Sequence, residues 1–236
     1  MRNVILNIAV ILSGITLLGS PVCALLYDFE DENQFSDWNV IQGSWSIIDG
    51  KLDGEGPQTG QPGVMIVLSD DIWNDEWKDY TVEFRASILE DTEDAGVVFR
   101  WQKAEPDDRR YYLYRIDNWP REFNQKQAEG WIAGNMQGQT RVEIESDLWY
   151  RFKLVVVGDR FNCYLDDELM FELQDPQQTY SWGRVGFRMW NSHARYDDLS
   201  IAGPGIPNTA VESDGKLSLT WGGIKTSGRM QAVAHD

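Results

Sequence analysis

The sequence predicts an all-β protein, built as an antiparallel sandwich or barrel. About thirteen short segments rich in β-branched and aromatic residues follow one another, and turn residues such as glycine, proline and aspartate separate them. Hardly any stretch has the 3.6-residue periodicity of an amphipathic helix, and strands do not alternate with helices. Strands without crossover helices form antiparallel sandwiches or barrels, so these are the expected architectures.

The predicted strands follow one another from residue 25 to residue 201. Residues 80–88 show the pattern best, because apolar and polar side chains alternate there as in a strand with one buried face. Pairs of turn residues at 158–159 and 166–167 predict tight hairpins. In order, strands are expected at 25–30, 45–48, 51–53, 64–68, 80–89, 96–101, 111–117, 141–144, 150–157, 161–165, 169–173, 185–190 and 194–201.

Three segments between or after these strands read as loops or linkers. Residues 54–63 are rich in glycine and proline, and residues 118–138 are polar and strand-poor, which predicts an excursion over a binding face. Residues 203–236 read as a linker followed by a short tail, for which attachment to a cell-surface partner, addition to a sheet edge and a frayed end are the alternatives.

Residues 1–24 have the features of a secretory signal peptide. Arg2 is followed by an apolar stretch over 4–18, and Val22 and Ala24 suit the −3 and −1 positions of cleavage after Ala24. An uncleaved anchor is the disfavoured alternative, because roughly 15 apolar residues fall short of the ~20 that span a bilayer. We therefore expect an exported protein without a stable membrane span, located outside the cell, in the periplasm or at the cell surface.

The charge of the chain excludes one large class of partners. Its 21 Lys and Arg against 38 Asp and Glu give a net charge of −17, whereas nucleic acids and anionic membranes need a cationic surface. Cys163, the cysteine that stays after removal of the leader, shares a strand face with Phe161 and Leu165 and is predicted to be a small buried hydrophobe. Stability must then come from core packing or a bound metal, since no internal disulfide can form.

Seven motifs occur in a fixed order along the chain. They are YDFE (27–30), GSWSIIDGKL (43–52), DYTVEF (79–84), AGVVFR (95–100), YLYR (112–115), GRVGF (183–187) and YDDL (196–199). The ordered set resembles the concanavalin A-like lectin/glucanase superfamily, in particular LamG-like jelly rolls, the 3-keto-disaccharide hydrolase domain and jelly-roll carbohydrate-binding modules. The resemblance covers residues 25–202. It implies a two-sheet antiparallel jelly-roll sandwich whose concave face, or the loops at its edge, carries ligands.

Strand alternation then assigns a candidate ligand face. Guanidinium groups bind vicinal hydroxyls or carboxylates, and indole rings stack on sugars, so such side chains on one surface indicate a glycan site. Three arginines in so acidic a chain predict a positive spot and an anionic or polyhydroxylated glycan; the alternative is pairing with nearby acids on a solvated sheet. The predicted ligand-binding residues are Arg100, Arg115, Asp117, Arg188 and Trp190, with Trp101, Trp119 and Trp131 beside them.

Acidic residues on the first and last strands form a candidate metal site. Asp28 and Glu30 lie on the first strand, Asp197 and Asp198 on the last, and the chain ends are neighbours in this architecture. Oxygen ligands of this kind suit Ca²⁺, and the resemblance implies a structural calcium at this place. The alternative is an acidic sheet edge without an ion.

The sequence gives little support to catalysis. Glu143 and Glu145 share a face but lack the middle acid of the glycosidase pattern, and His193 and His235 do not form a zinc set. The best hypothesis is an exported carbohydrate-binding sandwich with structural calcium. A glycan hydrolase of the 3-keto-disaccharide type and an extracellular adhesion or protein-binding module are the alternatives.

Overall fold

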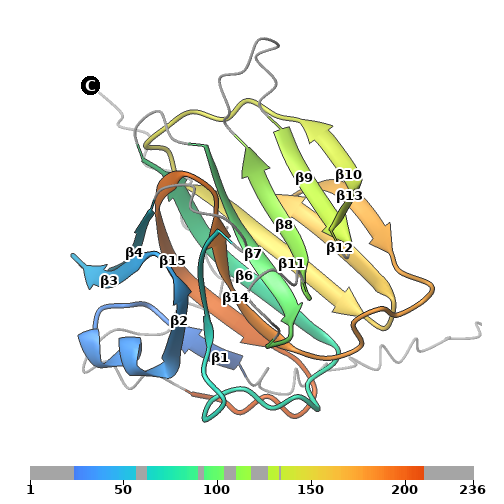
Figure 1. The fold of residues 1–236 in the computed structure, drawn as a ribbon, viewed down its shortest axis with the longest axis horizontal. Helices are drawn as coiled ribbons and strands as arrows, with labels where there is room; N and C mark the ends of the chain where they lie inside the picture. Colours follow the sequence, from blue (N-terminus) through green and yellow to red (C-terminus); the bar gives the residue numbers. More distant parts are fainter. Residues whose placement is uncertain are drawn as a thin grey trace, which may run out of the picture.

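A computed structural model describes residues 24–56, 63–89, 93–103, 110–117, 127–132 and 134–209. In these residues two antiparallel sheets lie face to face, and a short 3-10 helix, η1 (Glu32–Asp37), follows the first strand (Figure 1). No helix of the described ranges is long and apolar enough to cross a membrane. The leader up to residue 23 and the tail from residue 210 lie outside the described residues.

One sheet has eight strands among the described residues, and β1 (Ala24–Tyr27) joins it by pairing with β15. In pairing order its other strands are β13 (Glu168–Gln174), β12 (Arg160–Leu165), β11 (Tyr150–Val157), β6 (Tyr80–Ile88), β15 (Ser192–Ala202), β4 (Lys51–Gly56) and β3 (Ser44–Ile48).

The other sheet has seven strands among the described residues and lies in front in Figure 1. In pairing order its strands are β10 (Asn135–Arg141), β9 (Gln127–Ile132), β8 (Tyr112–Asp117), β7 (Asp94–Trp101), β14 (Arg184–Met189), β5 (Val64–Leu68) and β2 (Trp38–Gln42). The predicted two-sheet antiparallel sandwich is confirmed.

The core fills the space between the sheets with the apolar positions of the alternating strands. Phe84 and Phe152 stack with their ring centroids 4.6 Å apart, and Phe187 of the facing sheet lies 4.1 Å from Tyr196. Removing such rings from water is the main stabilising contribution to a fold without disulfides. Cys163 is fully buried in this cluster, as its place in the sequence predicts.

Both predicted hairpin turns are present. Gly158 has a φ of 56°, and the successive residues Asp166 and Asp167 have φ values of 48° and 69°. Two left-handed residues in a two-residue loop are typical of a type I′ turn, whose twist matches that of the flanking strands. These turns fix the register of β11, β12 and β13.

The prediction for residues 118–138 is wrong in its second half, which contains β9 and the start of β10. The inward positions of these strands include Gly130 and Gly138, where a Cβ atom would lie 2.5 and 2.7 Å from the ring of Phe171. Phe171 supplies the apolar volume, so β9 and β10 lack the apolar alternation that marks a strand. The strand expected at 141–144 is also displaced, because β10 ends at Arg141.

The first and last strands are neighbours, as the sequence predicts. Ala24 pairs with Ala202 and Tyr27 with Leu199. Thr209 returns to the same place, since its backbone N–H donates to the carbonyl of Ala24 at 3.1 Å. The two ends of the described chain therefore lie side by side, and the predicted cleavage point falls at the first residue of β1.

Candidate functional site

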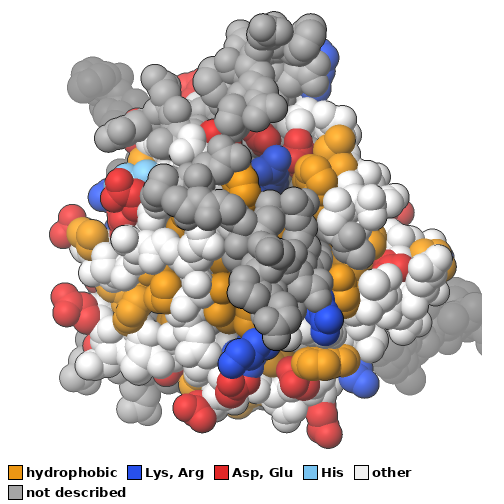
Figure 2. All heavy atoms as spheres, in the orientation of Figure 1, with side chains coloured by type: hydrophobic (Ala, Val, Ile, Leu, Met, Phe, Trp, Pro, Cys, Tyr) orange, Lys and Arg blue, Asp and Glu red, His pale blue; other side chains and the backbone are white. Residues whose placement is uncertain are grey.

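The outer face of the seven-stranded sheet gathers four of the five predicted ligand-binding residues. Arg115 on β8 and Arg188 on β14 both pair with Gly96 of β7, which lies between them. Cross-strand partners point to the same side of a sheet, so the two arginines flank a position without a side chain. Figure 2 looks onto this side and shows acidic, basic and hydrophobic side chains close together between atoms drawn in grey.

Arg115 is surrounded by carboxylates. Its Nε donates to Glu129 Oε2 at 2.9 Å, its Nη2 to Asp117 Oδ2 at 2.9 Å, and its Nη1 to Asp94 Oδ2. The indole of Trp131 lies beside it, with the guanidinium carbon 5.9 Å from the ring centroid. We call this group the Arg115 cluster; its members are Asp94, Arg115, Asp117, Gln127, Glu129, Trp131, Arg188 and Trp190.

Glu129 links the cluster to the edge of the sheet. Its Oε2 also accepts a hydrogen bond from Trp131 Nε1 at 2.9 Å, and its Oε1 accepts one from Gln127. The sequence predicted neither Glu129 nor Gln127 as site residues because both lie in the segment expected to be strand-poor. Their spacing of two, with Trp131 next in the series, is the signal that could have placed them on one strand face.

Asp94 holds the connection between β14 and β15, which carries Trp190. Its Oδ1 accepts a hydrogen bond from the backbone N–H of Trp190 at 2.6 Å, and its own N–H donates to Ser192 Oγ at 2.6 Å. Arg188 completes this side, since its guanidinium lies 5.0 Å from the centroid of the Trp190 ring and 3.6 Å from Asp94. A fully buried carboxylate thus fixes both an indole and a guanidinium.

Arg100 does not lie on this face, and the expectation that it would is wrong. Between Val98 and Trp101 strand β7 holds one residue more than its partner β14, and Arg100 takes a φ of 52°. Such a bulge reverses the alternation, so Trp101 points outward and Arg100 points toward the other sheet. There its guanidinium donates to the backbone carbonyls of Tyr180, Lys78 and Gly158 at 3.1, 3.3 and 2.6 Å.

The charge of the cluster differs from the predicted positive spot. Among the described residues, three carboxylates stand against two guanidinium groups, so the formal sum is −1. Burial on its own would lower the pKa of Arg115, but the three carboxylates, with Asp94 foremost, raise this pKa above the ordinary arginine value. Arg115 therefore stays charged and pairs with nearby acids, as in the alternative given for it, but these acids are buried and not solvated.

The cluster continues along the sheet into an apolar patch. Val98 and Leu113 follow Gly96 and Arg115 on the same face and are buried together with Met65. Since these side chains are closed to solvent, the described residues of the outer face do not form an open groove along the whole strand length. Trp131 and Trp190 remain partly exposed, and they lie at opposite ends of the cluster, because Trp131 pairs with Leu113 whereas Trp190 follows Arg188 beyond Gly96.

The predicted calcium ligands are not gathered into a metal site. Asp197 and Asp198 contact Arg85 at 2.6 and 2.7 Å, and Asp28 accepts hydrogen bonds from Gln34 and from the backbone N–H of Glu30. No group of three or more His, Cys, Asp or Glu in the described residues could hold a metal ion. Arg85 balances the charge of two of these four acids, and calcium binding at them stays a prediction of the sequence.

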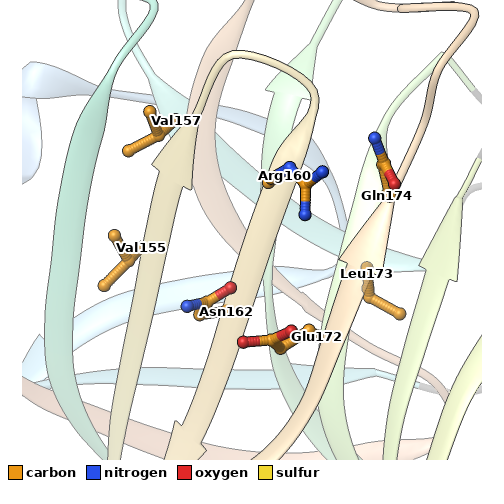
Figure 3. A pocket seen from close by; sticks show the side chains of 7 residues that line it. All are labelled: Val155, Val157, Arg160, Asn162, Glu172, Leu173 and Gln174. Carbon is orange, nitrogen blue, oxygen red and sulfur yellow. The ribbon is translucent and has the colours of Figure 1, made fainter.

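A shallow hollow lies on the outer face of the eight-stranded sheet. It has a volume of about 330 Å³, and Figure 3 shows polar side chains from two strands beside two valines. Its walls hold no aromatic side chain, so it lacks the stacking surface of the Arg115 cluster. The lining residues are Val155, Val157, Arg160, Asn162, Glu172, Leu173 and Gln174.

The remaining candidates for chemistry lie apart from the Arg115 cluster. Glu143 and Glu145 are exposed after the end of β10. On the eight-stranded sheet, His193 Nε2 lies 2.9 Å from Asp53. Trp119 and His235 lie outside the described residues.

The fold and this site agree with a family match over most of the chain. The model of the 3-keto-alpha-glucoside-1,2-lyase-like domain matches residues 27–202. The chain belongs to this family. The resemblance to the concanavalin A-like superfamily that the seven motifs indicated is thereby confirmed.

The chain is also similar to part of a longer protein. The levanase of Bacillus subtilis (strain 168) is 23% identical over 172 residues, which cover 71% of this chain and 23% of the levanase. This chain thus matches about a quarter of that enzyme's length.

Solved structures show the same fold. The carbohydrate-binding module CBM66 from Bacillus subtilis is 20% identical, with a TM-score of 0.57 over 71% of this chain and 96% of the module. The Bacillus licheniformis β-glucanase is 9% identical, with a TM-score of 0.54 over 78% of this chain and 100% of the enzyme. At these identities the likeness establishes the architecture, and function must be argued from the site.

Proposed function

We propose that this domain binds an uncharged carbohydrate at the Arg115 cluster. The observation that carries the proposal is a set of carboxylates locked in place by one arginine and flanked by two partly exposed indoles. Carboxylate oxygens accept strong hydrogen bonds from hydroxyl groups, and an indole covers the apolar side of a sugar ring. The carbohydrate-binding module and the levanase among the similar proteins support the same ligand class.

The closed apolar continuation of the face bears on the form of the ligand. Since Val98, Leu113 and Met65 are buried, the partly exposed indoles mark where the ligand contacts the protein. Because the two indoles lie at opposite ends of the cluster, this arrangement favours a ligand long enough to reach both of them.

The contacts of the carboxylates favour binding over catalysis. Both oxygens of Glu129 and both oxygens of Asp94 accept hydrogen bonds from protein groups. Glycosidases instead hold two carboxyl groups in different environments, one as an acid and one as a base or nucleophile. Glu129 and Asp94 are thus not placed to act as a general base.

The name of the family favours a second candidate, an enzyme acting on 3-keto-glycosides. Incubation of the purified protein with a 3-keto-glycoside separates the two. A binder leaves the substrate intact, whereas enzyme-dependent release of the aglycone would support the second candidate.

A glycan array with matched variants tests the binding proposal. Trp190→Ala and Arg188→Ala should abolish binding to the neutral glycans that the natural protein retains. Trp149→Ala is the control, because Trp149 also stacks with an arginine, 5.2 Å from Arg85, but on the other sheet. Loss of binding in Trp149→Ala alone, or no retained glycan at all, would refute the proposal.

We further propose that the protein acts after export, with residues 1–24 as the leader and the tail from residue 203 as a means of attachment. The support is the leader-like sequence, and N-terminal sequencing of the protein from culture supernatant and cell fractions tests it. Calcium binding at Asp28, Glu30, Asp197 and Asp198 stays a prediction of the sequence. Melting temperatures in calcium and in chelator test it.

A further inference from the structure

The guanidinium group of Arg115 has its hydrogen-bonding fork occupied by the protein itself. Nε and Nη2 lie 2.9 and 2.8 Å from Glu129, Nη2 also donates to Asp117 at 2.9 Å, and Nη1 donates to Asp94. Every nitrogen of the group thus contacts a protein carboxylate. A carboxylate on a ligand would have to displace one of these acids to gain the paired hydrogen bonds by which arginine recognises anions.

Asp117 is the carboxylate that a ligand would approach first. Its side chain is 11% exposed, against 5% for Glu129 and 0% for Asp94. It is thus the most exposed of the three acids that contact Arg115, whose own side chain is 15% exposed.

The second arginine does not reverse the sign of the face. The side chain of Arg188 is 7% exposed, and its guanidinium stacks on Trp190 while it lies 3.6 Å from Asp94. Glu93 adds another acid beside the connection between β14 and β15, where it accepts a hydrogen bond from Asn191 at 2.8 Å. The described groups around the site keep a negative sum.

We propose that Asp117 determines specificity by excluding anionic sugars, so that the site takes neutral glycans and rejects those that carry uronate groups. This inference rests on the proposed function. Like charges that meet in a partly desolvated site repel strongly, and this repulsion discriminates between ligands of the same shape. Replacing Asp117 with asparagine keeps the size of the side chain and removes one of the negative charges that balance Arg115.

The test compares two oligosaccharides that differ only in oxidation of C6 to a carboxylate. In isothermal titration the natural protein should bind the neutral form at least about tenfold more tightly, a difference of about 1.4 kcal/mol. At low salt, Asp117→Asn should lower the ratio of the affinity for the neutral form to the affinity for the oxidised form, or reverse it. High salt screens the attraction between Arg115 and the ligand carboxylate, so it should bring this ratio part of the way back. Asp167→Asn is the matched control, because it removes the same charge from the far sheet, where Asp167 pairs with Arg151.

A second readout keeps this inference separate from the proposed function. Glucuronate is titrated into each variant while the total tryptophan fluorescence, to which Trp131 and Trp190 contribute, is followed, and melting temperatures show that the variants are folded. A response of Asp117→Asn that the natural protein and Asp167→Asn lack supports the inference even if no oligosaccharide binds. Equal responses in all three proteins, or an unchanged neutral-to-uronate ratio in Asp117→Asn, would overturn it.

Discussion

Two buried arginines, Arg100 and Arg115, are balanced in opposite ways. Arg115 is held by carboxylates on the outer face, whereas Arg100 donates to three backbone carbonyls and stacks 5.1 Å from the ring centroid of Phe161. The carbonyls belong to the turn after β11 and to loops before β6 and β14. Arg100 therefore joins three separate connections at one end of the sandwich, which is a structural role.

Replacing Arg100 with methionine should destabilise the protein without removing ligand binding. The carbonyl groups of Tyr180, Lys78 and Gly158 lose their donor at a partly buried place, and we expect the free energy of unfolding to fall by about 3 kcal/mol. Urea unfolding measures the loss, and titration with a neutral glycan below the transition measures binding. Arg160→Met, at an exposed position of β12, is the control; an Arg100→Met protein that is fully stable but cannot bind glycan would contradict this assignment.

At the scale of single residues, alternation predicts side-chain direction wherever a strand is regular. Arg115, Asp117, Arg188 and Trp190 share a face as expected. Arg100 does not, since a bulge in β7 is a local backbone event that no apolar pattern records. Alternation placed Asp117 beside Arg115, but it says nothing of partners on other strands, which is why Asp94 and Glu129 were not predicted.

Among the elements, the connection between β14 and β15, which passes from one sheet to the other, has the largest bearing on the site. It presents Trp190, and two acids at the start of β7 hold it: Asp94 through the backbone of Trp190 and Glu93 through Asn191. Asn191 itself has a φ of 49°, a left-handed conformation that asparagine tolerates better than most residues. Asn191 thus contributes to the position of the indole both by its backbone conformation and by its hydrogen bond.

Two substitutions of Asn191 separate its backbone role from its hydrogen bond. Asn191→Ala should lower the free energy of unfolding by about 1 kcal/mol, because alanine resists a left-handed φ. Asn191→Gly should keep the stability, since glycine accepts this conformation, yet both variants should bind neutral glycan several-fold more weakly without the contact to Glu93. Urea unfolding and calorimetric titration check the two variants. An unchanged affinity for neutral glycan in both variants would show that the connection between β14 and β15 is held without Asn191.

For whole elements, the sequence predicts strands that carry their own apolar face and misses those whose partner supplies it. The alternating strand 80–88 has its expected place as β6, whereas β9 and β10 place glycines under Phe171 and read as loop. The same oversight concealed Gln127 and Glu129, two of the eight members of the cluster, because both lie on β9.

The whole molecule buries many tyrosine hydroxyl groups, and this sets its response to alkaline conditions. Burial is the largest cause of a raised pKa at Tyr150 and at five further tyrosines of the core and its rim, which are Tyr27, Tyr80, Tyr112, Tyr114 and Tyr196. In the unfolded chain the same groups lose their protons near pH 10. The native protein therefore holds more protons than the unfolded chain above this pH.

Stability should accordingly hold up to about pH 10 and then decline steeply, because the group with the raised native pKa favours folding below its unfolded value and loses that effect above it. Urea unfolding between pH 8 and pH 11 measures the decline. Absorbance of tyrosinate at 295 nm should rise for these groups together with unfolding, and titration of all nine tyrosines in a still-folded protein would contradict the prediction.

The adjacency of Ala24 and Thr209 has a mechanical consequence for the whole protein. Ala24 and Thr209 both lie near the end of β15 at Ala202, whereas Trp190 lies just before the opposite end of β15 at Ser192. Eleven residues of extended strand separate these ends by roughly 35 Å. Anything joined to either end of the domain would be attached at the end of the sandwich opposite Trp190. The proposed sugar contact at Trp190 would then face away from the point of attachment.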